Sequence, residues 1–359
     1  MRPLLRKALG LCAAFRGRAL EAVPERPIER APSRQPRVLL PAAPGQMIDR
    51  TEIFRRLREL ELGDPICGEP LPQQEQIAAA ALAAIGDAAA QGRYFPRRPN
   101  LLPQLMHAIN DEGVPQRELA AIIARDPSLV GSLLKIANSA FFRVNSQPVE
   151  TIERAIVMLG NDGLRSLIAA AVMQPIFRVS SAGAFPRFPD IVWEHAMRSA
   201  HAAIPHAALV ERVDPFAAEL LSLISGLAEI VLFRAAMDHY ADISRHGQPD
   251  SQVIACLLHS RSAAVAWRLG SSWELSELML AALEEQMLAS EPGTPLGRSL
   301  RFSRCAGALA VLHTNCVVDD ATVRRSLPDS GLSRAHFDFM LIRLLRKHED
   351  PRTAGRVAS

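Results

Sequence analysis

Cysteine is scarce in this sequence, and no two cysteines form a CxxC pair. Five of them are scattered along 359 residues, at Cys12, Cys67, Cys256, Cys305 and Cys316. An odd number of isolated cysteines provides neither a disulfide framework nor a zinc knuckle, and it is typical of proteins in a reducing compartment. We therefore interpret these cysteines as small buried hydrophobic residues and expect a cytoplasmic protein.

Long apolar runs, lysines and large aromatic residues are also rare. No segment reaches the ~18 uninterrupted apolar residues of a membrane span, so we expect no transmembrane segment. The net charge is only +3, and the chain has two tyrosines and three tryptophans. Weak positive charge and few stacking side chains argue against a nucleic-acid partner. Almost all basic residues are arginines, which we attribute to genomic codon bias rather than to a binding code.

Apolar residues, in contrast, make up 48% of the chain, enough for a sizeable buried core. Residues 1–46 are basic and then rich in proline, and we interpret them as a disordered N-terminal segment. The helical spacing of Ile53, Leu57 and Leu60 marks the start of a helical extension over 47–92. Since no long run alternates apolar and polar residues as a strand would, the sequence predicts an all-α fold.

A clear helix signal follows residue 125. Asp126 suits an N-cap and Pro127 the first helical position, and together they precede an amphipathic helix over 128–140. Asn138 and Ser139 stand at the end of this helix. Short polar side chains at such a place cap the last turn through bonds to nearby backbone groups. We therefore interpret these residues as architectural.

Similar signals continue into the second half of the chain. Thr151 suits an N-cap and Gly160 a helix stop. Pro205 lies inside a helical pattern that runs from 191 to 213, and we expect it to kink or split this helix. A break at 291–295 precedes a C-terminal helical extension over 291–359. Apolar periodicity predicts further helices at 214–237, 250–270, 273–289, 298–313 and 333–347.

Four segments match a known pattern in order, spacing and residue type: LLPQL at 101–105, IARDP at 123–127, LLKIANS at 133–139 and IERAIVMLG at 152–160. Together they resemble the HDOD family, bacterial signalling modules related to HD-domain phosphohydrolases, over 93–290. The resemblance implies a multi-helical HD-like globule, here with extra N- and C-terminal helices, and a role in signal transduction. We interpret its signature residues as structural: Asp126, Pro127, Asn138, Ser139, Leu159, Gly160 and Trp193.

The resemblance also implies where a metal would bind, because HD phosphohydrolases use a first histidine, a His-Asp pair and a distal aspartate. His195 matches the first histidine, but Ser225 and Gly226 stand where the His-Asp pair belongs. Neither residue can replace those ligands. Further histidines of the pattern are also replaced, by Ser262, Glu285 and Gln286. We therefore expect no catalytic residue, no metal and no cofactor, with His195 a lone remnant at best.

The sequence thus predicts a non-catalytic regulatory module that binds signalling proteins, in a second-messenger or two-component pathway. A nucleotide second messenger stays open as a ligand. Two alternatives also stay open: a metal-dependent HD-type phosphohydrolase with an atypical site, and a helix-turn-helix DNA-binding regulator. The DNA-binding alternative rests on the helix–turn–helix spacing of residues 117–138. The broad apolar stripe in this segment favours burial over contacts with bases.

Overall fold

The structure, a computed structural model, describes residues 41–66, 72–86, 94, 123, 127–138, 149–177, 184–243, 249–327 and 330–345. All of them belong to one compact unit, residues 37–359. Residues 1–40 of the predicted disordered segment are not among the described residues. The same holds for the whole family segment at 101–105.

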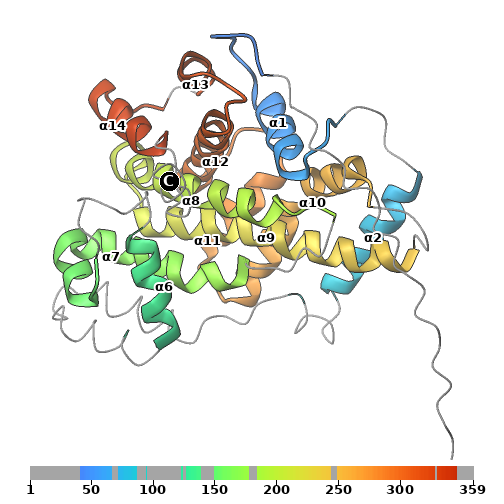
Figure 1. Cartoon of the computed structure of the whole chain (residues 1–359), viewed down its shortest axis with the longest axis horizontal. Helices are drawn as coiled ribbons and strands as arrows, with labels where there is room; N and C mark the ends of the chain where they lie inside the picture. The colour runs from blue at the N-terminus through green and yellow to red at the C-terminus, as the bar shows by residue number, and fades with distance from the viewer. Residues whose placement is uncertain are drawn as a thin grey trace, which may run out of the picture. The chain divides into compact units, whose positions relative to one another are not determined.

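No strand occurs among the described residues, and the predicted all-α fold is confirmed (Figure 1). The elements are α1 (Arg50–Leu62), α2 (Pro72–Gly86), α6 (Pro127–Ala137), α7 (Ile152–Phe177), α8 (Phe188–His206), the π-helical turn η1 (Ala207–Glu211), α9 (Pro215–Ile243), α10 (Ser251–Ser272), α11 (Glu277–Glu284), the 3-10 turn η2 (Glu285–Met287), α12 (Pro295–Thr314), α13 (Asp320–Ser326) and α14 (Arg334–Leu344). The helices predicted after 127 are present with shifted ends, whereas α13 was not predicted.

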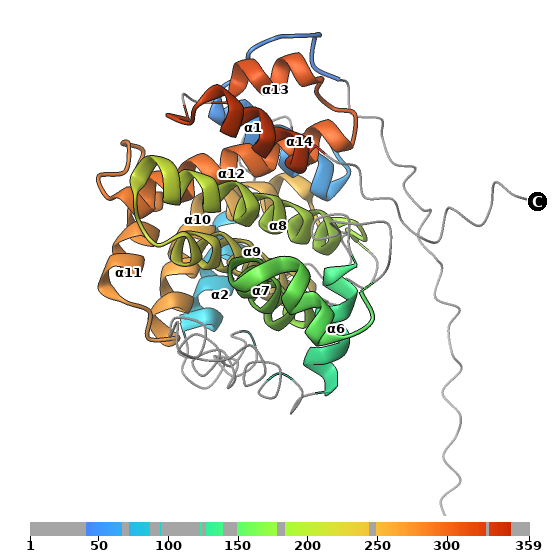
Figure 2. The same cartoon turned by 90° about the vertical axis from the view of Figure 1, so that its left-hand side faces the viewer.

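Helix α9 lies at the centre of the main core. Every residue from Phe216 to Phe233 is buried, and α2, α7, α8 and α10 pack around the helix (Figures 1 and 2). A helix that is apolar on all sides needs such a complete cover. By length and composition α9 is also the one helix in the described part that could cross a membrane, but its apolar window is wholly buried in the fold.

Two of three local predictions from the sequence agree with the backbone. The hydroxyl of Thr151 accepts a hydrogen bond from the Arg154 backbone N–H at 3.2 Å, as an N-cap does. Gly160 breaks α7 with a φ of 66°, a value that favours glycine. Pro205 is the last but one residue of α8, and the chain passes into the wider turn η1 directly after His206. The helix type thus changes just after Pro205, but Ala207 keeps a helical backbone and the chain leaves the helix only at Arg212, so the kink or split expected at Pro205 stays a prediction.

A second hydrophobic core joins α1, near the start of the described chain, to the C-terminal helices. It contains residues of α1, α12, α13 and α14, such as Leu57 and Leu309, and Figure 2 shows these helices together above α8. The segment before α1 reaches α13, because the Ile48 N–H donates to the Ser326 hydroxyl at 2.9 Å. Helix α1 of the first predicted extension thus shares this core with the second extension, whereas α2 packs in the main core; the boundaries at 47–92 and 291–359 stay predictions.

Candidate functional site

Five charged or ionisable side chains from four helices meet inside the fold around His195. Helix α1 contributes Arg58 and Glu61, α8 contributes His195, α9 contributes Glu229, and α12 contributes Arg304. Four of them are buried, and only Arg304 keeps a small exposed part. We call these five residues the charge cluster. Buried charges persist in proteins when they are paired, and the pairing here is extensive.

Glu229 is the hub of the charge cluster. Arg58 donates to both of its carboxylate oxygens, from Nη1 to Oε2 at 2.9 Å and from Nη2 to Oε1 at 2.7 Å. Arg304 Nη2 donates to Oε1 as well, at 2.7 Å. Arg58 Nη1 also donates to Glu61 Oε2, at 2.5 Å. Two guanidinium groups therefore hold one completely buried carboxylate, with the fork geometry that arginine provides.

The two carboxyl groups of the charge cluster have opposite pKa shifts. Burial alone would raise the pKa of Glu229, but the attraction and hydrogen bonds of Arg58, together with Arg304, lower it to about 2. Burial raises the pKa of Glu61 to about 8, because its attraction to Arg58 is too weak to offset desolvation and the nearby charge of Glu229. Glu229 is therefore ionised at neutral pH, whereas burial shifts Glu61 toward its protonated form.

His195 is neutral and anchored to α12. Burial lowers its pKa to about 4. Its Nε2 lies 3.1 Å from the carbonyl oxygen of Arg304, so Nε2 carries the proton and donates it, and Nδ1 holds a lone pair. The ring meets Phe54 edge to face at 6.1 Å, and Arg304 lies over the same phenyl ring. Among the described residues, neither His195 Nδ1 nor Glu61 Oε1 has a hydrogen-bond partner.

The residues predicted to stand in place of the family's other ligands have structural contacts. The hydroxyl groups of Ser225 and Ser262 donate to backbone carbonyls of their own helices, at 2.8 and 2.6 Å. Glu285 accepts from the Thr294 hydroxyl and backbone N–H, at 2.6 and 2.9 Å, which fixes the start of α12. Gln286 donates to carbonyl oxygens of α11 and α12. The two serines thus satisfy their buried hydroxyl groups within their own helices, whereas Glu285 and Gln286 hold the start of α12.

The charge cluster can be tested as a metal site, since one ligand atom each of Glu61, His195 and Glu229 lies within 4.8 Å of the others. A divalent ion needs free lone pairs in an environment that tolerates more positive charge. Both Glu229 oxygens already accept guanidinium N–H bonds, and Arg58 and Arg304 place two positive charges beside the same atoms. The residues present therefore do not fit a divalent metal.

Of the family-signature residues that the structure describes, Pro127 and Asn138 stand at the two ends of α6. Asn138 donates from Nδ2 to the carbonyls of Leu134 and Val149, both at 2.8 Å, and accepts from the Val149 N–H at 2.7 Å. These bonds tie the end of α6 to the start of α7. Pro127 begins α6, whereas Asp126 and Ser139 lie outside the described residues. Leu159 and Trp193 pack, partly buried, against the main core.

Glu229, Glu61 and the two arginines are not among the site residues predicted from the sequence. One signal was present: Glu229 interrupts an otherwise apolar stretch of α9, one turn after Ser225. A carboxylate in such a stretch predicts a buried partner of opposite charge. The identity of that partner could not be read from the sequence, because Arg58 is 171 residues away.

Comparisons with known proteins agree with this fold. The family model of the HDOD domain matches residues 95–288. A candidate metal-dependent phosphohydrolase from Shewanella amazonensis SB2B has a similar structure, with a TM-score of 0.52 and 16% identity over 77% of this chain and 99% of that chain. An HDOD domain protein from Geobacter sulfurreducens has a TM-score of 0.49 and 17% identity over 76% and 96%. At such identities the likeness concerns the fold alone.

One curated relative is an uncharacterized protein of Treponema pallidum (strain Nichols). It is 34% identical over 74 residues, which cover 21% of this chain and 14% of that protein.

His195 and Glu229 lie inside the matched HDOD region, whereas Arg58 and Arg304 lie outside it. The two cations of the charge cluster thus come from the helices that flank the family domain.

Proposed function

Because the chain belongs to the HDOD domain family, we propose that it is a non-catalytic regulatory module that acts by binding other signalling proteins in the cytoplasm. The observation that carries the proposal is the pairing of Glu229 with Arg58 and Arg304 beside His195. Arginines from the flanking helices supply the positive charge at the place where the resemblance implies a metal.

This replacement removes the chemistry of hydrolysis. A bound divalent ion lowers the pKa of water and thereby supplies a nucleophile near neutral pH. A guanidinium group orients and neutralises anions, but it does not coordinate and activate water in this way. Here both guanidinium groups also already donate hydrogen bonds to Glu229. A module of this kind regulates through contacts, in a second-messenger or two-component pathway.

A hydrolysis assay tests the non-catalytic part of the proposal. The full chain would be incubated with Mn²⁺, Fe²⁺ or Mg²⁺ and with bis(p-nitrophenyl) phosphate or a cyclic dinucleotide. We expect wild type and the His195→Ala variant to show the same background rate. Turnover by wild type that disappears in His195→Ala would contradict the proposal.

Chemical cross-linking in the native cell tests the partner. The full chain, expressed at its natural level, would be cross-linked, purified and analysed by mass spectrometry. We expect a defined signalling protein that is recovered in repeated experiments and rebinds the purified chain. A chain that is recovered alone and that binds no purified pathway protein would argue against a protein-binding role.

A second candidate is the atypical HD-type phosphohydrolase. The approach of the Glu61, His195 and Glu229 ligand atoms to within 4.8 Å of one another supports it, but the positive charges of Arg58 and Arg304 beside Glu229 oppose it. The DNA-binding alternative has no such support. Leu133 and Ile136 of α6 are buried, and this helix packs on α7.

A further inference from the structure

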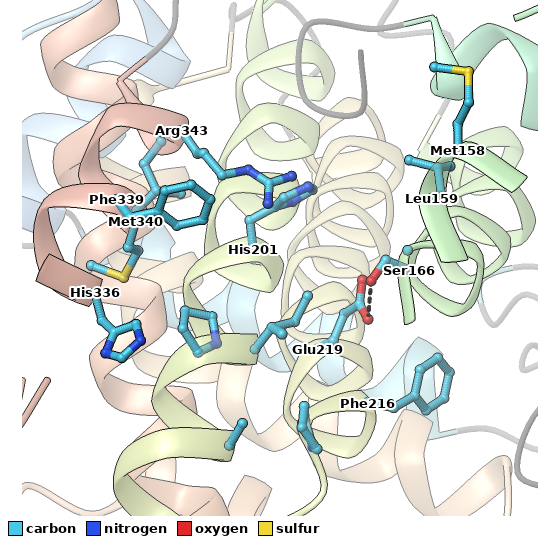
Figure 3. Close-up of a pocket in the computed structure, with 16 residues that line it drawn as sticks. Met158, Leu159, Ser166, His201, Phe216, Glu219, His336, Phe339, Met340 and Arg343 are labelled. Carbon is cyan, nitrogen blue, oxygen red and sulfur yellow. Dashed lines mark hydrogen bonds between the residues drawn. The ribbon is translucent and has the colours of Figure 1, made fainter. Parts of the chain in front are cut away.

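A pocket of about 540 Å³ lies between α14 and the helices α7, α8 and α9 (Figure 3). No residue of the charge cluster lines it. Its volume falls in the ~300–1,000 Å³ range of small-molecule sites. Helix α14 follows the matched HDOD region and the other three helices belong to it, so a ligand there would touch both parts.

Most of the lining is apolar. Ile204 and Pro205 come from α8, Phe216 comes from α9, and Met340 comes from α14. Leu159 of α7 stands on the opposite side from α14 (Figure 3). Such a lining favours a ligand with an apolar body of about the size of two or three fused rings.

One buried carboxyl group interrupts this apolar lining. Glu219 projects from α9 and is only 2% exposed. The Ser166 hydroxyl donates to its Oε2 at 2.9 Å, as drawn in Figure 3. Among the described residues, no donor reaches the second oxygen, Oε1. Oε1 is therefore the oxygen that a ligand in the pocket can meet.

Glu219 lacks a cation that would balance a negative charge. Burial raises its pKa to about 8, the hydrogen bond from Ser166 lowers the pKa, and the charge of Asp214 raises it. No basic group of the described residues is among these causes. The carboxyl group is therefore protonated at pH 6. Because Oε2 already accepts from Ser166, the proton lies on Oε1, and the group presents an O–H donor to the pocket.

This arrangement favours an uncharged ligand. A protonated Glu219 gives a cation no partner of opposite charge. Arg343, on the α14 side, has partners within the fold and lies over the Phe339 ring, 5.8 Å from its centre. Moving an ionised group from water into a largely apolar lining costs more than moving an uncharged one.

We propose that this pocket binds an uncharged, largely apolar small molecule whose carbonyl or hydroxyl oxygen accepts a hydrogen bond from Glu219. Its apolar body lies over Ile204, Pro205 and Phe216. A ligand without an acceptor would leave the buried O–H group unpaired, which disfavours it. The proposal goes beyond the regulatory role above and stands whether or not the charge cluster binds metal, because the two sites share no residue.

Two naphthalene probes of the same shape test the contact with Glu219. 2-Acetylnaphthalene has a carbonyl oxygen where 2-isopropenylnaphthalene has a methylene group. Their affinities would be measured at pH 6, by displacement of the fluorescent reporter N-phenyl-1-naphthylamine from the folded full chain. The ratio of ketone to alkene affinity is compared between wild type and Glu219→Leu, so the different hydration of the two probes cancels. We expect a ratio about three- to tenfold higher in wild type, the effect of one hydrogen bond.

Three further variants locate the site. Glu219→Gln should keep the ketone preference, because its amide N–H can still donate. Ile204→Trp would fill the pocket and should abolish the binding of the reporter and of both probes. Leu209→Trp, in η1 and outside the lining, is the matched control and should leave all affinities unchanged. Circular dichroism would show that each variant is folded.

The charged analogues 2-naphthoate and 2-(aminomethyl)naphthalene test the class of ligand, and both should bind wild type more weakly than the ketone. Tighter binding of either one than of the ketone would overturn the proposal. So would reporter binding that survives Ile204→Trp, or equal ketone-to-alkene ratios in wild type and Glu219→Leu.

Discussion

Arg58 Nη2 lies 2.7 Å from Glu229 Oε1, and this contact joins α1, outside the matched family region, to the central helix α9. A second bond from Arg58 Nη1 makes the pair bidentate. The flanking N-terminal helix is thus held to the family domain by a completely buried ion pair. Removing one partner of such a pair costs more than removing both, because one charge is left alone in the interior.

The charge cluster predicts an unequal mutant cycle. Glu229→Gln leaves two buried guanidinium groups without their anion and should cost about 3–5 kcal/mol of unfolding free energy. Arg58→Met should cost less, because Arg304 still neutralises Glu229. The double variant should cost less than the sum of the single variants. Urea unfolding of the four proteins measures these differences.

An exposed ion pair provides the control for this cycle. Arg324 pairs with Asp320 and Asp338 at the surface, and the Arg324→Gln variant should cost about 0–1 kcal/mol. Equal costs for Arg324→Gln and Glu229→Gln would show that the charge cluster does not stabilise the fold as described.

Gly307 should not accept a side chain. It lies where α12 packs on α8, and a Cβ added there would stand 2.7 Å from the backbone nitrogen of Ser199. Gly307→Ala should therefore separate the two helices and lower the free energy of unfolding by about 1–3 kcal/mol. Gly131→Ala in α6 is the matched control, because its Cβ would meet nothing within 4 Å. Thermal unfolding should rank the control at or above wild type.

Glu219 should make stability fall as pH rises. Its folded-state pKa of about 8 exceeds the ordinary value of 4.5, so the folded protein holds a proton that the unfolded chain loses between these pH values. Each pH unit in this window should cost about 1.4 kcal/mol relative to the Glu219→Gln variant, which keeps a neutral side chain. Urea unfolding of both proteins from pH 5 to 8 measures this relative slope.

Ser166→Ala provides a second check on Glu219. Its hydroxyl group lowers the pKa of Glu219 through the 2.9 Å hydrogen bond, so its loss should extend the loss of stability to higher pH. A constant difference between wild type and Glu219→Gln over the whole range would show that Glu219 is ionised in the folded protein at neutral pH.

The helix signals could be read from the sequence because they act over a few residues. The Thr151 hydroxyl accepts a hydrogen bond from the first turn of its helix. Gly160 adopts a backbone conformation with positive φ, and Pro205 has no backbone N–H to donate. The predicted loss of the His-Asp pair has a related basis, since the resemblance assigns Ser225 and Gly226 to the positions of that pair.

The charge cluster could not be read in this way. Its members come from four helices, and their meeting depends on how α1 and α12 pack against α8 and α9. The resemblance predicts that His195 is at best a lone remnant of a metal site, but the sequence does not show that Arg58 and Arg304 stand beside it. The unpredicted helix α13 is different, because it carries a local start signal: the Asp319 carboxylate accepts from the Thr322 backbone N–H at 2.8 Å, as an N-cap does.

Isothermal titration of the purified full chain with Mn²⁺ tests the central claim most directly. Because two guanidinium groups hold Glu229 beside His195, we predict no stoichiometric binding and no shift of the unfolding temperature with Mn²⁺ or after treatment with EDTA. One Mn²⁺ bound per chain, with the binding lost in His195→Ala, would contradict the account.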